Sequence, residues 1–170
     1  VDGDVLQQID IAGLGIDLSP EMLALARAQL AQQSLHHCSV RQGDLYDLPM
    51  QDGTVDLVTS HMVLHYLDDP AASIAEAARV LKPGGRLLIA DFAPHELDFL
   101  RDGHAHRRLG FSEGEVNEWL ADAGLNVGET RVLPPEGGED AKLTVLIWVA
   151  DKRGSSPRTT KASIEFEGVK

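Results

Sequence analysis

The stretch GLGIDLSP, residues 13–20, predicts a short strand that ends in an acid and is followed at once by a helix. Ser19 is a favourable N-cap, and Pro20 suits the first helical position because the N–H that it lacks would be unsatisfied there. Glu21 adds a favourable negative charge to the first turn. The acid that ends the strand, Asp17, is therefore expected beside a helix N-terminus.

Asp17 is a candidate binding residue. A carboxylate at the carboxyl end of a strand is placed to bind the two hydroxyls of a ribose, as in open α/β sheets that hold nucleoside cofactors. An ionised acceptor would form charge-assisted hydrogen bonds there. The alternative is that Asp17 is a second cap for the helix. Because Ser19 already supplies a cap, the ribose role is the favoured interpretation.

The bulk composition indicates one ordinary globular domain. The chain has 170 residues, of which 43% are hydrophobic and 25% charged. No apolar run approaches the roughly 20 residues that span a bilayer, and no leader is recognisable, so we expect a cytoplasmic protein without a membrane segment. The single cysteine, Cys38, excludes an internal disulfide. A formal net charge of −12 argues against broad contact with nucleic acid.

Strand and helix signals alternate, which predicts βαβ units and a mainly parallel sheet. Ser112 and Glu115 form a capping box, and Pro83-Gly84-Gly85 stops the preceding helix. The expected strands are 13–17, 38–42, 55–60 and 86–91, the helices are 20–33, 70–82 and 112–124, and 125–133 with 142–150 form an antiparallel pair. We expect one domain over 1–151 and a basic, solvated tail over 152–170.

Several segments together resemble a known family. The chain is similar to the class I S-adenosylmethionine-dependent methyltransferases of the small-molecule type, related to the quinone C-methyltransferases. The resemblance runs from about residue 12 to 151, in the family's order and spacing, and is carried by GIDLS (15–19), GDL (43–45), LPM (48–50) with VDLV (55–58), and LKPGGRL (81–87). It implies a doubly wound, Rossmann-like α/β sheet, mainly parallel, with an antiparallel C-terminal strand pair.

A closer likeness is to the methyltransferase half of proteins that also carry a winged-helix domain of the arsenic-repressor type, on residues 104–111, HAHRRLGF. The chain departs from the family at its start. The family begins with a strand and a glycine-rich turn, whereas no such loop precedes Asp17. The N-terminal strand is therefore missing or replaced: the chain is truncated, another segment takes the slot, or the pocket is incomplete. A sheet without its middle strand invites pairing with another chain, so a homodimer is one expected form.

The resemblance implies a set of cofactor-binding residues. Asp17 would accept hydrogen bonds from the ribose, and Asp44 would receive the adenine amino group with the Leu45 amide facing the ring. The alternative for Asp44 is an ordinary Gly-Asp turn. Leu18 and Met22 either pack on the adenine or belong to the core. Ser60 and His61, with Met62, would line the sulfonium end of S-adenosylmethionine.

His61 and His65 are the catalytic candidates. They are four apart and would share a face if the segment were helical. A histidine suits proton removal from an acceptor hydroxyl or acidic carbon. Alternatively the two histidines face the substrate, bind a metal or form a polar lining of the cleft. No metal is expected, because no third ligand has obvious spacing.

Basic residues after the strand 86–91 would cover the substrate in this family and suit an anionic or phenolic acceptor, unless they form a solvated helix surface; they are His95, His104, His106, Arg107 and Arg108. The implied function is methyl transfer to a small-molecule acceptor. The alternative is a catalytically impaired sensor or scaffold, because the glycine loop is missing. A nicotinamide dehydrogenase fits less well, since LKPGG and the closing antiparallel pair do not suit it.

Overall fold

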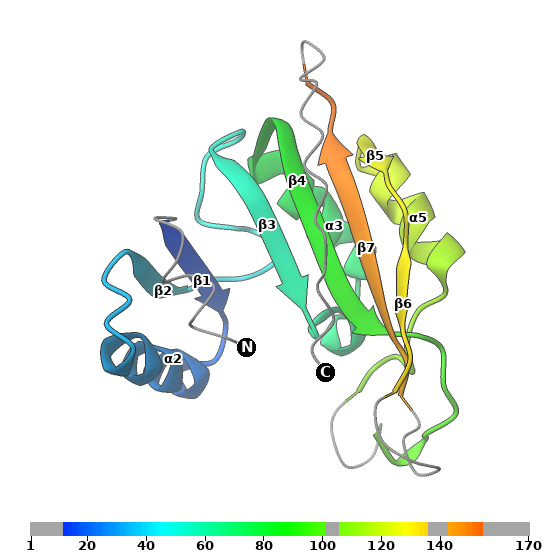
Figure 1. Cartoon of the computed structure of the whole chain (residues 1–170), viewed down its shortest axis with the longest axis horizontal. Helices are drawn as coiled ribbons and strands as arrows, with labels where there is room; N and C mark the ends of the chain where they lie inside the picture. The colour runs from blue at the N-terminus through cyan, green and yellow to red at the C-terminus, as the bar shows by residue number, and fades with distance from the viewer. Residues whose placement is uncertain (1–11, 101–105, 136–142, 155–170) are drawn as a thin grey trace, which may run out of the picture.

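The computed structural model describes residues 12–100, 106–135 and 143–154. Figure 1 shows the alternation of strands and helices that the sequence predicts, which confirms the α/β class. In chain order the elements are β1 (Gly13–Asp17), α2 (Pro20–Gln32), β2 (Cys38–Gln42), β3 (Val55–His61), the 3-10 turn η1 (Leu64–Tyr66), α3 (Pro70–Val80), β4 (Leu81–Phe92), α5 (Glu113–Asp122), β5 (Leu125–Val127), β6 (Arg131–Leu133) and β7 (Val145–Lys152).

The strands form two sheets. β1 and β2 make a parallel pair in which Asp17 lies opposite Gln42. The larger sheet has the order β3-β4-β7-β5, with β6 also paired to β7. β3 and β4 are parallel, and β7 is antiparallel to its three partners. Parallel strands followed by an antiparallel C-terminal set confirm the predicted sheet type.

Within the described residues, no strand joins the two sheets. β1 pairs with β2 alone and β3 with β4 alone, and Figure 1 shows the two groups of strands apart. One edge of β1 and one edge of β3 therefore carry no ladder partner in this part of the chain. Leu14 on β1 is 43% exposed and Leu57 on β3 is 52% exposed. Within the described residues, the two parallel pairs are therefore not joined into one sheet.

Side chains of α3 connect the two parts. Arg79 donates to the carbonyls of Leu48 (3.1 Å) and Met50 (2.9 Å) in the β2–β3 connection. Glu76 accepts from the Leu48 amide at 2.7 Å and pairs with Arg79 at 2.6 Å. The Arg79 guanidinium lowers the pKa of Glu76 by hydrogen bonding, so that carboxylate stays charged.

The core lies between the larger sheet and the helices α3 and α5, which cover one face of it (Figure 1). Leu87 and Ile89 of β4 and Trp148 of β7 are each 1% exposed. Phe111 and Val116, at the start of α5, are fully buried against them. β4 thus lies at the apolar centre of the domain, hydrogen-bonded to β3 on one side and to β7 on the other.

Several predicted boundaries are wrong. The strand expected over 86–91 begins at Leu81, so the predicted helix stop, Pro83-Gly84-Gly85, lies within β4, and the strand expected over 142–150 spans Val145–Lys152. The helix expected over 70–82 ends at Val80, because Leu81 is extended (φ −66, ψ 136) and pairs with Val55. The strand expected over 125–133 is interrupted. Val127 lies opposite Ala150 and Arg131 opposite Ile147, so residues 128–130 face only 148–149 and form a bulge.

Lys152 caps α3 from a distant strand. It is the last residue of β7, and its ammonium donates to the carbonyls of Ala78 (2.7 Å), Arg79 (3.2 Å) and Leu81 (2.8 Å). These carbonyls end the helix and have no intrahelical donors. Lys152 thus lies with the domain and not in the tail predicted over 152–170. The rest of the tail stays a prediction, since residues 155–170 lie outside the described ones.

We predict that Lys152→Met lowers the free energy of unfolding by about 1.5–3 kcal/mol, because three carbonyls lose a charged donor. Urea unfolding followed by circular dichroism measures it as a lower midpoint at unchanged slope. The control is Arg153→Met, which removes an exposed neighbour bonded to Asn126 and should change stability by no more than about 0.5 kcal/mol. Equal stability of Lys152→Met and the native chain would contradict the capping role.

Candidate functional site

Two acidic residues lie at the carboxyl edge of the small sheet. Asp17 is the last residue of β1, and Asp44 follows β2. Because β1 and β2 are parallel, both side chains lie at the same edge, and both residues are exposed. Each uses its Oδ1 in a local turn: Asp17 accepts from the Ser19 amide at 2.8 Å, and Asp44 accepts from the Tyr46 amide at 2.9 Å. Among the described residues, neither Oδ2 is engaged in a hydrogen bond, so each can accept from a ligand.

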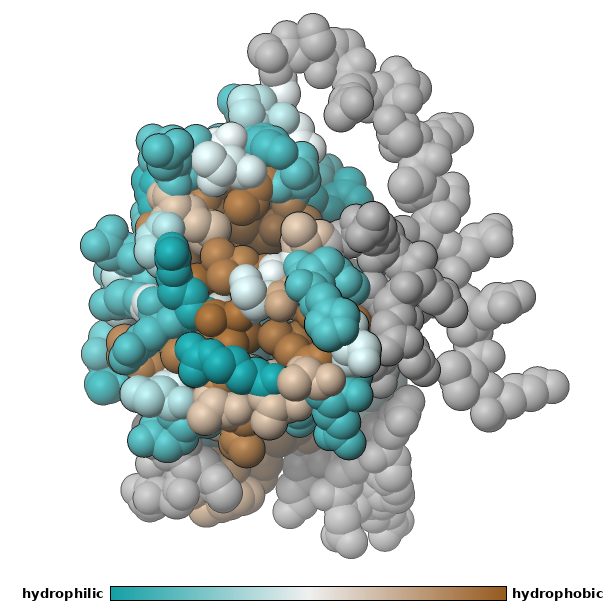
Figure 2. Space-filling model, turned by 90° about the vertical axis from the view of Figure 1, so that its left-hand side faces the viewer, coloured by the Kyte–Doolittle hydropathy of each residue, from teal (hydrophilic) through white to brown (hydrophobic). Residues whose placement is uncertain are grey.

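Leu18 and Met22 extend this edge as apolar surface. Leu18 is 66% exposed and Met22 is 53% exposed, so the alternative that they belong to the core is wrong. Figure 2, viewed from the side of β1, β2 and α2, shows apolar surface surrounded by hydrophilic residues. Leu45, which follows Asp44, is half-buried. Acidic acceptors beside exposed apolar side chains fit the predicted contacts with a nucleoside.

The end of β3 carries the third predicted group. Ser60 is half-buried, and His61 is exposed opposite Ala90 of β4. Met62 adopts a positive φ of 51°, and its amide donates to the Ala90 carbonyl at 2.8 Å. A non-glycine residue in this region is uncommon and marks a sharp turn fixed by its surroundings. The chain therefore turns away abruptly after His61.

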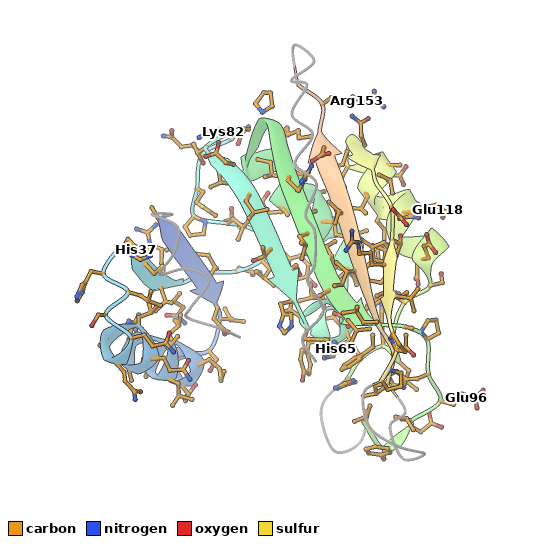
Figure 3. All side chains as sticks on the ribbon, in the orientation of Figure 1. His37, His65, Lys82, Glu96, Glu118 and Arg153 are labelled. Atoms are coloured by element: carbon orange, nitrogen blue, oxygen red, sulfur yellow. The ribbon has the colours of Figure 1, made fainter. Side chains whose placement is uncertain are left out.

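The two candidate catalytic histidines do not share a helical face. His61 ends β3, whereas His65 lies in the single 3-10 turn η1. His65 is only 2% exposed, and Figure 3 shows it at the carboxyl ends of β3 and β4. A spacing of four residues puts two side chains on one face only in a helix. Here the strand continues through His61, and the backbone reverses at Met62.

A buried carboxylate that the sequence argument did not single out holds His65. Asp91 is 0% exposed, and its Oδ1 lies 2.7 Å from His65 Nδ1. The Phe92 amide also donates to Oδ1 (2.8 Å), and the Leu64 amide donates to Oδ2 (2.9 Å). The signal that could have found it was an acid inside the apolar strand 87–92, LLIADF.

Aromatic rings and further histidines surround His65. Its ring centroid lies 4.2 Å from that of His106, 4.1 Å from Tyr66 and 5.1 Å from Phe92. The His95 ring meets Phe92 edge-on at 5.9 Å. The structure thus brings His95 and His106 to the same place as His65, a grouping that the sequence analysis did not predict. His104 lies outside the described residues.

The segment that covers His65 is held by its backbone. The amides of Arg107 and Arg108 donate to the His65 carbonyl at 2.9 and 3.2 Å. Their side chains form ion pairs, Arg107 with Asp68 and Arg108 with Glu115. Both arginines are therefore neutralised locally, which favours the solvated-surface alternative for them over contact with an anionic acceptor.

His95 stays neutral at physiological pH. Burial, and then the nearby His65, lower its pKa from the usual value. Its Nδ1 accepts from the Leu97 amide at 3.3 Å, which places the proton on Nε2. Nε2 is buried and meets no hydrogen-bond partner among the described residues. A buried donor without a partner is costly and marks a place where a ligand oxygen would be favourable.

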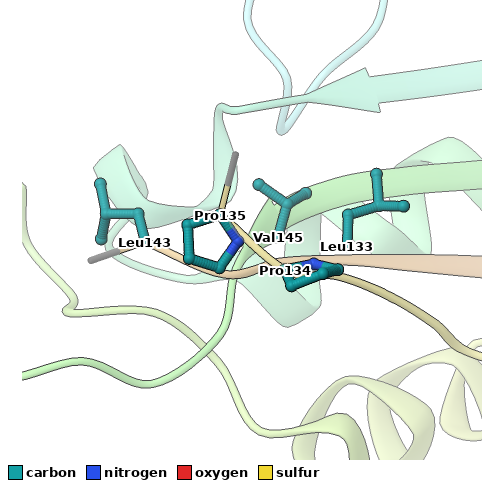
Figure 4. A pocket seen from close by; sticks show the side chains of 5 residues that line it. All are labelled: Leu133, Pro134, Pro135, Leu143 and Val145. Carbon is teal, nitrogen blue, oxygen red and sulfur yellow. The ribbon is translucent and has the colours of Figure 1, made fainter. Parts of the chain in front are cut away.

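An apolar hollow lies at the same end of the larger sheet. It encloses about 370 Å³ and is lined by Leu133, Pro134, Pro135, Leu143 and Val145 (Figure 4). Val145 lies opposite Phe92 in the sheet, and Leu133 lies opposite Val145. The hollow therefore begins on β7, the strand next to β4, and extends to β6, beyond the Phe92 ring that contacts the histidines.

The described residues hold no group of three or more metal-ligating side chains, so the metal alternative for His61 and His65 finds no support in them. None of the helices described here is long and apolar enough to cross a membrane.

Comparison with known proteins identifies the family. The methyltransferase-domain family matches residues 4–89, half of the chain. A solved structure of a methyltransferase from Haloferax volcanii, in complex with the activator Trm112, is 30% identical with a TM-score of 0.68, over 83% of this chain and 72% of that one. The chain therefore belongs to the class I methyltransferase-domain family, and its Rossmann-like fold is confirmed.

Two further similarities are to a curated relative and to a solved structure that shares the fold. The chain is 38% identical over 125 residues to a malonyl-(acyl-carrier protein) O-methyltransferase of Hahella chejuensis, covering 68% of this chain and 42% of that protein. A geranyl diphosphate methyltransferase solved with S-adenosylmethionine has a TM-score of 0.68 at 19% identity, over 82% of this chain and 68% of that one. Of the first curated relatives, the chain spans only 22% to 45% of their length. These likenesses do not favour the sensor or scaffold alternative.

We predict that His95 makes stability depend on pH below neutrality. Its pKa is lowered in the folded chain, so the unfolded chain binds more protons once the pH falls below about 6.5. Its contribution is present above that pH and is lost as the pH falls toward the folded pKa. Urea unfolding at a series of pH values measures it: His95→Gln should flatten the decline, and His36→Gln, at an exposed position, should not. Parallel curves for His95→Gln and the native chain would refute the assignment.

Proposed function

We propose that the protein transfers a methyl group from S-adenosylmethionine to a small-molecule acceptor. When bound, the cofactor supplies a methyl group already activated on a positively charged sulfur. The protein then has mainly to align donor and acceptor, and alignment alone can contribute about 7–11 kcal/mol in the best cases. Family membership and the residues at the carboxyl edges of β1, β2 and β3 support this proposal.

The observation that carries it is the pair Asp17 and Asp44. We infer that Asp17 Oδ2 accepts from the ribose hydroxyls and that Asp44 receives the adenine amino group, with the Leu45 amide facing the ring. The exposed Leu18 and Met22 would pack on the adenine.

Ser60 and His61 would line the sulfonium end of the cofactor, since they end the strand β3. His65 is the proposed base, because it is the histidine grouped with other polar rings at the end of β4. His61, exposed and without such a group, is proposed to contact the cofactor by its backbone.

We also infer that a further strand completes the cofactor site. The facing edges of β1 and β3 have no ladder partner in the described chain, and an unpaired edge is a template for another strand. A second chain, as in a homodimer, would supply this strand. A cytoplasmic location and the likeness to arsenic-repressor fusions stay predictions.

We predict that Asp17→Ala weakens binding of S-adenosylhomocysteine by about 1.5–3 kcal/mol, or about 10- to 150-fold in Kd, since hydrogen bonds to a charged group are lost. Asp17→Asn is the sharper variant: its Oδ1 still accepts from the Ser19 amide, so the turn is kept while the charge goes. Titration calorimetry of the whole protein measures both.

Asp122→Ala, an exposed acid at the end of α5, is the matched control and should bind as the native protein does. Native affinity in Asp17→Asn, with weaker binding only in Asp17→Ala, would assign Asp17 to the turn alone. No binding and no thermal stabilisation of the native whole protein at millimolar ligand would reject the proposed function.

A further inference from the structure

We propose that Asp91 is a positioning residue that fixes the tautomer of His65, so that His65 Nε2 takes the proton of a phenolic methyl acceptor whose oxygen His95 Nε2–H holds. This inference rests on the proposed methyl transfer and deepens it by naming the acceptor chemistry and a residue that acts through the base.

The tautomer follows from the donors around Asp91. The amides of Leu64 and Phe92 donate to its two oxygens, so the carboxylate presents acceptors on both sides. His65 Nδ1, at 2.7 Å from Oδ1, is therefore the donor in that contact. A neutral imidazole with its proton on Nδ1 carries its lone pair on Nε2. Asp91 thus makes Nε2 the basic atom of His65.

The same pair suits the charged state that proton transfer creates. When Nε2 accepts a proton, the imidazolium remains next to a carboxylate that is itself 0% exposed. A charge-assisted bond in surroundings of low polarity is stronger than one in water. Asp91 therefore stabilises the product of proton removal as well as orienting the base.

His95 supplies the second polar contact. Its proton lies on Nε2, which is buried and unmatched among the described residues. Its ring and the ring of His65 both contact Phe92. The lowered pKa of His95 keeps it neutral, so it donates to an oxygen and does not compete for the proton.

The surroundings indicate an aromatic acceptor. The rings of Tyr66, Phe92 and His106 surround His65, and stacked or edge-on rings favour an aromatic partner. The other titratable groups around His65 are Asp91, His95, His106 and Tyr66, while Arg107 is paired with Asp68. The His106 ring lies 4.2 Å from the His65 ring, centroid to centroid, and forms one wall of this aromatic group.

The step balances as an in-line displacement. His65 Nε2 takes the hydroxyl proton, and the electron pair of the oxygen forms the new bond to the methyl carbon. The carbon–sulfur bond breaks with its electron pair staying on sulfur, which leaves S-adenosylhomocysteine and the methyl ether. His65 then releases its proton to water.

The test uses the whole protein with catechol and 4-nitrophenol as probe acceptors. Nitrogen-15 NMR of the histidine rings should place the His65 proton on Nδ1 in the native protein and not in Asp91→Asn. Formation of S-adenosylhomocysteine should fall about 10²-fold or more in kcat for Asp91→Asn and His65→Gln, with little further loss in the double variant. Asp151→Asn, which removes an exposed acid paired with Arg86, is the matched control and should keep native turnover.

Binding and turnover, measured on the same proteins, separate the two proposals. Binding of S-adenosylhomocysteine should be unchanged in Asp91→Asn, because Asp91 acts only on the acceptor side, and the acid limb of the kcat–pH profile should move in that variant. A native protein that binds S-adenosylhomocysteine but methylates neither phenol overturns this inference and leaves the proposed function standing. Native turnover or an unmoved pH profile in Asp91→Asn also overturns it, whereas failure of the native protein to bind S-adenosylhomocysteine rejects the proposed function itself.

Discussion

The buried carboxylate of Asp91 is the constraint on which the site depends. A charge with 0% exposure is tolerated only when donors surround it, and here the donors are two backbone amides and the His65 ring. Removing one partner of such a buried pair typically costs about 3–5 kcal/mol. The need to satisfy this one carboxylate therefore fixes both the turn η1 and the orientation of His65.

The position of His65 in turn affects the segment 107–111. His65, once held by Asp91, offers its carbonyl to the amides of Arg107 and Arg108. A few residues later Gly110 adopts a φ of +82°, and a Cβ there would lie 2.1 Å from the Ala93 carbonyl oxygen. Only glycine permits this approach, which brings the Phe111 amide to the Phe92 carbonyl at 2.9 Å. The end of β4 thus organises residues on both sides of it.

Local signals in the sequence predicted most elements correctly. Ser19 caps α2 by accepting from the Met22 amide at 3.2 Å, and Ser112 caps α5 by accepting from the Glu115 amide at 3.2 Å. Such caps depend on residues three apart, so a short window of sequence contains the whole interaction. Alternation of apolar strands and helices then predicted the sheet type in the same way.

Interactions between distant residues were not predictable in this manner. His65 and Asp91 are 26 residues apart, and Lys152 caps a helix more than 70 residues earlier. The residue types alone do not identify which side chains contact each other, because these contacts depend on which strands lie side by side. The expected helical face of His61 and His65 failed for a local reason: the positive φ of Met62 reverses the chain between them.

The two halves of the proposed reaction lie on different sheets, and this sets a requirement on the fold. Asp17 and Asp44 belong to the β1–β2 pair, whereas His65 and Asp91 belong to the end of β4. Displacement needs the reacting atoms about 3–3.5 Å apart. Within the described residues, the hydrogen bonds that link the two parts run between the β2–β3 connection and α3 with the residue before it. Glu76 and Arg79 bind Leu48, Met50 and Asp52. The Gly53 and Thr54 amides donate to the Arg79 and Val80 carbonyls, and the Asp69 amide donates to the Tyr46 hydroxyl at 3.1 Å. These hydrogen bonds position the β2–β3 connection, but none of them is made to the strand β1. A strand paired to both β1 and β3 would hold their two edges in one register. For this reason we place the strand that completes the site between β1 and β3.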